Sequence, residues 1–211
     1  MNLRRSKAPF NPVMQVAARD QAVVSKHYTA ANAILEYGSG GSTVLAAELG
    51  KPVMSVESDS SWAKQMNTLL ASRHPNAQAT VQHVNIGKTG QWGKPLGPDG
   101  ALNYHSYPMS AWDSKGFHHP DAILIDGRFR VACFCTTLLR LKEPATILFD
   151  DYNKRDKYHI VERLLRPVER HERMAVFEAN PTQIPADEWA WIIQSFFQTT
   201  YAKKRAIWWK R

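Results

Sequence analysis

Acidic residues follow two apolar segments of the sequence, at the point where each segment ends. Asp126 comes directly after residues 121–125, and Asp150 and Asp151 come directly after residues 145–149. If both segments are neighbouring strands of a parallel sheet, about 4.8 Å apart, these carboxylates converge at one edge. Oxygen ligands favour a hard divalent cation, with Mg²⁺ first and Mn²⁺ or Ca²⁺ next. The pattern predicts a metal site at Asp126, Asp150 and Asp151.

Three carboxylates in one cleft repel one another, so the cluster needs compensation. A divalent cation provides it, but so does a proton on one acid or a set of nearby cations. Basic residues follow the acids closely in the sequence, at Arg128, Arg130, Lys154 and Arg155. A salt-bridged network without a metal is therefore an alternative interpretation of the same residues.

A glycine-rich segment, residues 36–43 (Glu-Tyr-Gly-Ser-Gly-Gly-Ser-Thr), lies where the apolar segment 33–37 gives way to a helical pattern. In a doubly wound sheet this turn is the place where a nucleotide binds. Gly38 and Gly40 let the backbone approach a ligand closely, and the neighbouring serines present hydroxyls at a helix N-terminus. Thr43 stands where a dinucleotide fingerprint requires a further glycine, which weakens a pyrophosphate interpretation.

A carboxylate at the end of the second apolar segment, Glu57, completes this pattern because it can accept hydrogen bonds from both hydroxyls of a ribose. Together with the Glu-x-Gly-x-Gly motif it resembles the class I S-adenosylmethionine-dependent methyltransferases, over residues 30–198. The resemblance implies a seven-stranded sheet with a terminal antiparallel hairpin, and S-adenosylmethionine as cofactor. It also implies that Asn85 contacts the adenine. The expected cofactor-binding residues are Glu36, Gly38, Ser39, Gly40, Ser42, Glu57, Asn85 and Asp126.

The acid cluster is similar to that of the metal-dependent O-methyltransferases of the catechol and macrolide-sugar kind. This resemblance implies O-methylation of a small hydroxylated acceptor, with a cation at Asp126, Asp150 and Asp151 that lowers the pKa of the hydroxyl. The sugar-modifying members often carry a second acid, thought to be the base, where this chain has Arg128. The candidate catalytic residues are therefore Asp126 and two histidines of a long loop, His105 and His118, with His119 as a further candidate base.

The elements that must position these residues alternate between strand and helix. A leading helix is expected over 13–26, with strands at 33–37, 52–57, 79–84, 121–125 and 145–149 and helices at 42–49, 59–70, 130–141 and 157–165. Residues 174–178 and 189–197 are expected to form the hairpin. Such alternation predicts an α/β, Rossmann-like, doubly wound and mostly parallel sheet. Residues 86–120 hold six glycines and four prolines and are expected to form a long loop.

Length and composition limit the number of domains and the class of protein. The 211 residues suit one methyltransferase-like domain over 1–211, with an N-terminal arm and helix at 1–30 and a basic aromatic tail at 199–211. A hydrophobic content of 44% excludes disorder of the bulk. The apolar runs are too short to span a membrane and no secretory signal precedes them, so a cytoplasmic location is expected. Cys133 and Cys135 are expected to be buried thiols.

The formal charge of +8 favours an acidic partner. A small-molecule acceptor, an anionic one included, is the first expectation, and a homodimer is compatible with it. Two alternatives stay open: a catalytically silent cofactor-binding domain with an interaction role, and a nucleic-acid methyltransferase whose basic tail binds phosphates. The segment Asp126-Gly127-Arg128-Phe129 lacks the two prolines that enzymes acting on nucleic-acid bases usually carry there.

Overall fold

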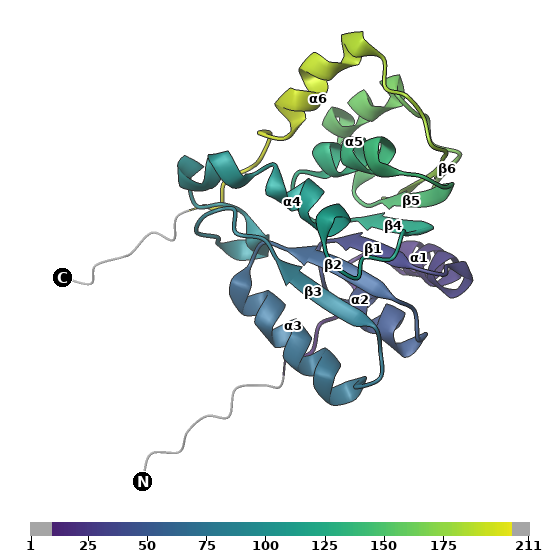
Figure 1. Ribbon diagram of the computed structural model, residues 1–211, viewed down its shortest axis with the longest axis vertical. Coiled ribbons are helices and arrows are strands. Elements are labelled where there is room, and N and C mark those ends of the chain that lie inside the picture. The colour runs from purple at the N-terminus through teal and green to yellow at the C-terminus, as the bar shows by residue number, and fades with distance from the viewer. Residues whose placement is uncertain (1–9, 204–211) are drawn as a thin grey trace, which may run out of the picture.

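Residues 10–203 are described by a computed structural model of the chain. They form a seven-stranded sheet in the order β3-β2-β1-β4-β5-β7-β6, in which β1 to β5 are parallel and β7 runs antiparallel to β5 and β6 (Figure 1). The strands are β1 Ile34–Tyr37, β2 Val53–Glu57, β3 Ala79–His83, β4 Ala122–Ile125, β5 Ala145–Phe149, β6 Glu169–Arg170 and β7 Ala175–Ala179. The Rossmann-like fold class expected from the sequence is confirmed.

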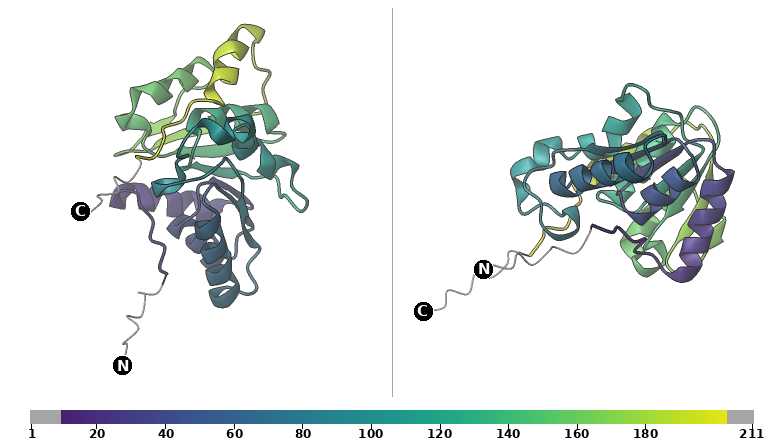
Figure 2. Two further views of the ribbon diagram at one scale, coloured as in Figure 1. Left: turned by 90° about the vertical axis from the view of Figure 1, so that its left-hand side faces the viewer. Right: turned by 90° about the horizontal axis from the view of Figure 1, so that it is seen from below.

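Helices cover both faces of this sheet (Figure 2). The α-helices are α1 Ala18–Ala30, α2 Gly41–Glu48, α3 Ser60–Arg73, α4 Ser106–Met109, α5 Arg130–Arg140 and α6 Trp189–Ser195. Alternate strand residues divide the core: Ile34 of β1 packs with α1 and α2, whereas its neighbour Leu35 packs with the side of α4, α5 and α6. The two-residue period of the strands thus makes two apolar layers from one sheet.

The terminal hairpin exists, but one of its strands is not where the sequence pattern placed it. Most of the expected strand 189–197 is helix α6, Trp189–Ser195, and β7 pairs instead with the two-residue strand β6. The misassignment has a physical reason: Ile192 and Ser195 are buried and Ile193 is exposed, which is the three-residue spacing of a helical face. Both residues of β6 are exposed, so no apolar alternation marks it in the sequence.

Two other segments differ in detail. The glycine-rich region 86–120 holds four short helical turns, η1 Gln91–Gly93, η2 Pro98–Asn103, α4 and η3 Ser110–Asp113, rather than a loop alone. The expected helix 157–165 is the 3₁₀ helix η5 Asp156–Arg163, which follows the turn η4 Tyr152–Lys154. The remaining turn is η6 Ala186–Glu188.

Neither chain end is described in full. Residues 1–9 of the expected arm and 204–211 of the expected tail lie outside the described residues. Within residues 10–203, no helix is long and apolar enough to cross a membrane. Cys133 and Cys135 are free and buried, as expected.

Candidate functional site

A cavity of about 770 Å³ lies at the carboxyl edge of the central strands. Its floor is the glycine loop after β1, where Gly38 has a φ of +102° and packs against Gly127 after β4. A Cβ on Gly38 would lie 3.0 Å from the Cα of Gly127, so both loops need glycine to approach this closely. A Cβ on Gly40 would meet nothing within 4 Å, which leaves its surroundings open to a ligand.

Glu57 lines the same cavity at the end of β2. Its Oε1 accepts hydrogen bonds from the backbone amides of Ser58, at 2.7 Å, and Asp59, at 2.9 Å. Its Oε2 has only long contacts with Ser39, at 3.2 Å to Oγ and 3.4 Å to the amide. One oxygen therefore fixes the carboxylate, and the other is available to a ligand hydroxyl.

The inserted region 86–120 closes the cavity above this carboxylate. A Cβ on Gly93 would lie 2.3 Å from the Ser58 hydroxyl and 3.2 Å from Glu57 Oε1, and the Gly93 carbonyl accepts a hydrogen bond from that hydroxyl at 2.9 Å. On the other side, residues 11–16 line the cavity ahead of α1. The inserted region was expected at the site, but residues 11–16 were not, because nothing in their residue types marks a fold-back onto the strand ends.

Glu36, the first residue of the glycine motif, has a structural position beneath the loop. It is fully buried and accepts hydrogen bonds from Tyr28, at 2.7 Å, Thr43, at 2.5 Å, and Ser55. Burial raises the pKa of its carboxyl, and these hydroxyl donors oppose the shift. Glu36 is not among the residues that line the cavity, so it anchors the loop and does not face the ligand space.

The other sequence-predicted site residues divide into two groups. The structure brings Gly38, Ser39, Gly40, Ser42, Glu57, Asp126 and Asp151 together along the cavity wall. It leaves Asn85, His105 and His118 exposed and outside the lining, and His119 accepts a hydrogen bond from the amide of Lys142 at 2.9 Å. The placement therefore offers no support for an adenine contact by Asn85 or for a histidine base.

Arginines surround the three aspartates that follow β4 and β5. Arg130, on α5, contacts Asp126 at 2.7 Å, Asp150 at 3.3 Å and Asp151 at 3.5 Å. Arg173, which precedes β7, contacts Asp150 at 3.0 Å and Asp151 at 2.5 Å. A third arginine, Arg155, contacts Asp151 at 2.6 Å, so three guanidinium groups face three carboxylates. Arg173 was missed in the sequence because it lies 22 residues beyond Asp151 (173 − 151) and reaches the acids only through the antiparallel return of the chain.

These ion pairs decide whether a divalent cation fits. Mg²⁺ and Mn²⁺ require carboxylate oxygens that are not held by other cations. Every one of Asp126, Asp150 and Asp151 is paired with arginine, and no group of three potential metal ligands occurs within residues 10–203. The salt-bridged network is the arrangement that these residues form, and it offers no support for the metal predicted from the sequence.

Addition of Mn²⁺ tests whether the three aspartates bind a divalent cation. We expect the electron paramagnetic resonance signal of free Mn²⁺ to be unchanged by the protein at neutral pH, because arginines already balance the charge of the three carboxylates. The Asp150→Asn variant is the matched control and should behave identically. Stoichiometric loss of the free-ion signal that disappears in Asp150→Asn would show that a cation displaces the arginines.

Asp126 differs from the other two acids. Its side chain is 32% exposed and lines the cavity, whereas Asp150 is fully buried. Arg130 holds Asp126 Oδ1, and Oδ2 has no hydrogen-bond partner within the described part of the chain. Desolvation raises the pKa of Asp126 to about 7, against the opposing effect of Arg130 and with reinforcement from Asp150. An acid of this kind can accept a proton near neutral pH.

Comparisons with known proteins agree with the fold. No family model matches the sequence, and no curated protein matches it. Among solved structures, a methyltransferase-like protein from Silicibacter pomeroyi is 40% identical, with 89% of this chain and 98% of that chain covered and a TM-score of 0.85. The chain therefore belongs to the class I S-adenosylmethionine-dependent methyltransferases, in the group of methyltransferase-like proteins that this structure represents.

Two more distant structures share the fold alone. An S-adenosylhomocysteine-bound methyltransferase from Podospora anserina is 14% identical, with 80% of each chain covered and a TM-score of 0.55. An O-methyltransferase from Streptomyces achromogenes, solved with S-adenosylmethionine, is 14% identical, with 79% of this chain and 82% of that chain covered and a TM-score of 0.53.

Proposed function

We propose that this protein transfers a methyl group from S-adenosylmethionine to an oxygen of a small acceptor, with Asp126 as the proton acceptor and without a divalent metal. The observation that carries the proposal is that one cavity holds both Glu57, at the end of β2, and Asp126, at the end of β4. The first is placed to bind a ribose, and the second is placed to take a proton from a group beside it.

The residues of the cavity fit the cofactor. The amides after Gly38 and Gly40 lie at the N-terminus of α2, where a helix favours negatively charged and acceptor groups. Glu57 Oε2 is available to ribose hydroxyls. The cavity, about 770 Å³, is within the range of about 300–1,000 Å³ that holds ligands of this size.

Bound S-adenosylmethionine supplies a methyl group made electrophilic by its sulfonium sulfur. The chain then has two tasks. It must hold the acceptor oxygen in line with that methyl group, and it must remove the proton that the oxygen loses as the new bond forms. Asp126 is the candidate for the second task, because it lines the cavity and because Arg130 contacts only Oδ1 of its carboxylate, while Oδ2 has no hydrogen-bond partner within residues 10–203.

Calorimetry with S-adenosylmethionine and S-adenosylhomocysteine tests the cofactor part of the proposal. We expect both to bind, and we expect Glu57→Gln to weaken binding on the order of 10- to 100-fold, the usual loss of a hydrogen bond to a charged group. Glu48→Gln, at the exposed end of α2, is the matched control and should bind as the unmodified protein does. Failure of the unmodified protein to bind either compound would contradict the proposal.

A nucleic-acid acceptor and a homodimer stay predictions from the sequence. The basic tail on which the first depends falls mostly in residues 204–211, outside the described residues. The described cavity, lined on its two sides by residues 11–16 and 91–94, favours a small acceptor.

A further inference from the structure

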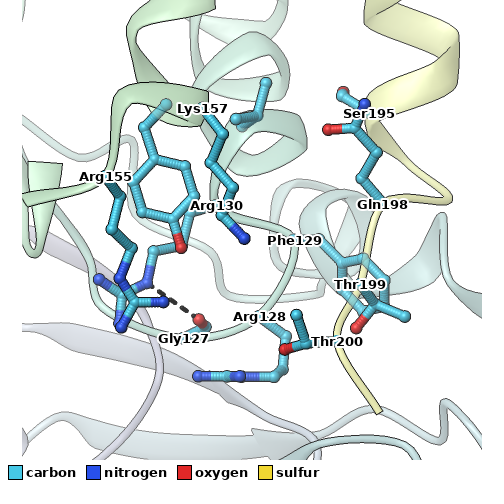
Figure 3. Close-up of a pocket in the computed structure, with 12 residues that line it drawn as sticks. Gly127, Arg128, Phe129, Arg130, Arg155, Lys157, Ser195, Gln198, Thr199 and Thr200 are labelled. Atoms are coloured by element: carbon cyan, nitrogen blue, oxygen red, sulfur yellow. Dashed lines mark hydrogen bonds between the residues drawn. The ribbon is translucent and has the colours of Figure 1, made fainter.

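A second cavity, of about 370 Å³, adjoins the cofactor cavity and shares Gly127, Arg128, Arg130 and Arg155 with it. It lies between the turn after β4, the start of η5 and the segment that follows α6. Figure 3 shows the side chains of Arg128, Arg155 and Lys157 arranged around this hollow, with the threonines of the last segment on the opposite side. The remaining lining residues are Phe129, Val131, Tyr158, Ser195, Gln198, Thr199 and Thr200.

The charge in this second cavity is not balanced within the described chain. Arg155 pairs with Asp151, but Arg128 and Lys157 make no ion pair within residues 10–203. Arg130 also lines this cavity but is paired with the aspartates, and a further cation, Lys94 of the inserted region, lines the adjoining cofactor cavity. Burial lowers the pKa of Lys94, and repulsion from Arg128, Arg155 and Lys157 lowers it further. Lys94 therefore lies close enough to these three cations to be repelled by them.

Cations gathered at a concave surface repel one another, and a bound anion would relieve this repulsion. The three nearby aspartates do not relieve it, because they already pair with Arg130, Arg173 and Arg155. Guanidinium groups and the Tyr158, Thr199 and Thr200 hydroxyls are also the donors that bind carboxylate or phosphate oxygens. We propose that this second cavity, which we call the basic acceptor pocket, binds a carboxylate or phosphate group of the methyl acceptor, so that the substrate is a small acidic molecule.

This inference rests on the proposed function and adds the substrate class to it. The basic acceptor pocket, about 370 Å³, has room for an anionic group together with the body of a small acceptor. It adjoins the cofactor cavity, which Asp126 lines, at the residues that both cavities share, among them Gly127 and Arg128. An anion held by Arg128 and Lys157 would place the rest of the acceptor beside the proton-accepting carboxylate.

The test measures binding of inorganic phosphate, malonate and the neutral molecule glycerol by ¹H–¹⁵N NMR titration, with ionic strength held constant with NaCl. We expect phosphate or malonate to shift the amide signals of residues 127–131 and 198–200, and glycerol to leave them unchanged. Binding of malonate alone would identify a carboxylate site, and binding of phosphate alone would identify a phosphate site. Binding of both would show that the pocket recognises the anionic oxygens that they share. Each of these outcomes supports the proposal.

Variants make the test specific. Arg128→Gln and Lys157→Gln should each weaken anion binding about 10-fold or more, since each removes a charged hydrogen-bond donor. Lys154→Gln removes an exposed lysine that lines neither cavity, and it should change the affinity less than about twofold. Absence of anion binding, or equal affinities in all three variants, would overturn the basic acceptor pocket. S-adenosylmethionine binding is measured on the same samples, and its loss in the unmodified protein would instead overturn the proposed function.

Discussion

Replacement of Asp126 by asparagine is expected to reduce kcat by about 10²- to 10⁴-fold, the usual contribution of a positioned general base. Asparagine preserves the shape of the side chain but cannot accept a proton. Because Glu57 and the glycine loop are untouched, S-adenosylmethionine should bind with nearly unchanged affinity. The rate is followed as S-adenosylhomocysteine formed with any acceptor that the unmodified protein methylates. An unchanged kcat in this variant would exclude Asp126 as the base.

The pH dependence gives a second readout of the same residue. Burial raises the pKa of Asp126 to about 7, so the carboxylate form that accepts a proton is present above pH 7 and lost below it. We expect kcat/KM to rise with pH up to about 7 and then level off. A ¹³C NMR titration of the aspartate carboxyl groups, which needs no acceptor, should show one signal with a midpoint near 7 that is absent in Asp126→Asn. A midpoint near the ordinary aspartate value would contradict the assignment.

The raised pKa also sets the sign of the effect on stability. The folded state holds the Asp126 proton more tightly than the unfolded state, for which the pKa is about 3.9. Ionisation of Asp126 between these two pKa values therefore destabilises the fold as pH rises. Asparagine resembles the protonated form, so we expect the free energy of unfolding of Asp126→Asn at pH 8 to be no lower than that of the unmodified protein. A loss of activity together with a loss of stability would point to misfolding instead.

Replacement of Arg130 by methionine is expected to lower the free energy of unfolding by about 3–5 kcal/mol, the cost of removing one partner from a buried ion pair. Arg130 is 7% exposed and pairs with all three aspartates of the site. It also donates to the carbonyls of Gly127, Asp126 and Asp150, at 3.1, 2.7 and 2.5 Å, and so joins the turns after β4 and β5. Its loss leaves buried carboxylates with fewer cations and two loops with fewer contacts.

Urea denaturation measures this effect, with a control on the same helix. Arg140 pairs with Asp113 at 2.6 Å, but both side chains are partly exposed, so Arg140→Met should cost less than about 1 kcal/mol. The penalty of Arg130→Met should shrink as the pH is lowered, because protonation of the aspartates removes the charges that lack a partner. Equal costs for the two variants, or a penalty independent of pH, would show that Arg130 acts through packing and not through charge.

The spacing of residues along the chain predicted the sheet and the residues at the ends of its strands. The alternation of strands and helices predicted the doubly wound, parallel part of the sheet, since parallel strands joined by right-handed crossovers leave few topologies. The loop after β1 and the carboxylate at the end of β2 were placed correctly at one cavity, because the ends of neighbouring parallel strands must meet at one edge. Helix α6 was predicted as a strand, because the sequence of a short apolar segment does not show whether it forms a strand or a helix until its pattern of burial is known.

By itself, the sequence determined the fold class, the position of the glycine loop and the convergence of Asp126, Asp150 and Asp151, because each depends on residues close together in the chain or on the shared edge of the sheet. Only the tertiary structure decided what neutralises those acids. Arg130 reaches them from α5 and Arg173 from the antiparallel return before β7. It also placed the histidines of the inserted region away from the site and residues 11–16 against it. These outcomes depend on contacts between distant segments, and charge pairing of that kind leaves no periodic signal in a sequence.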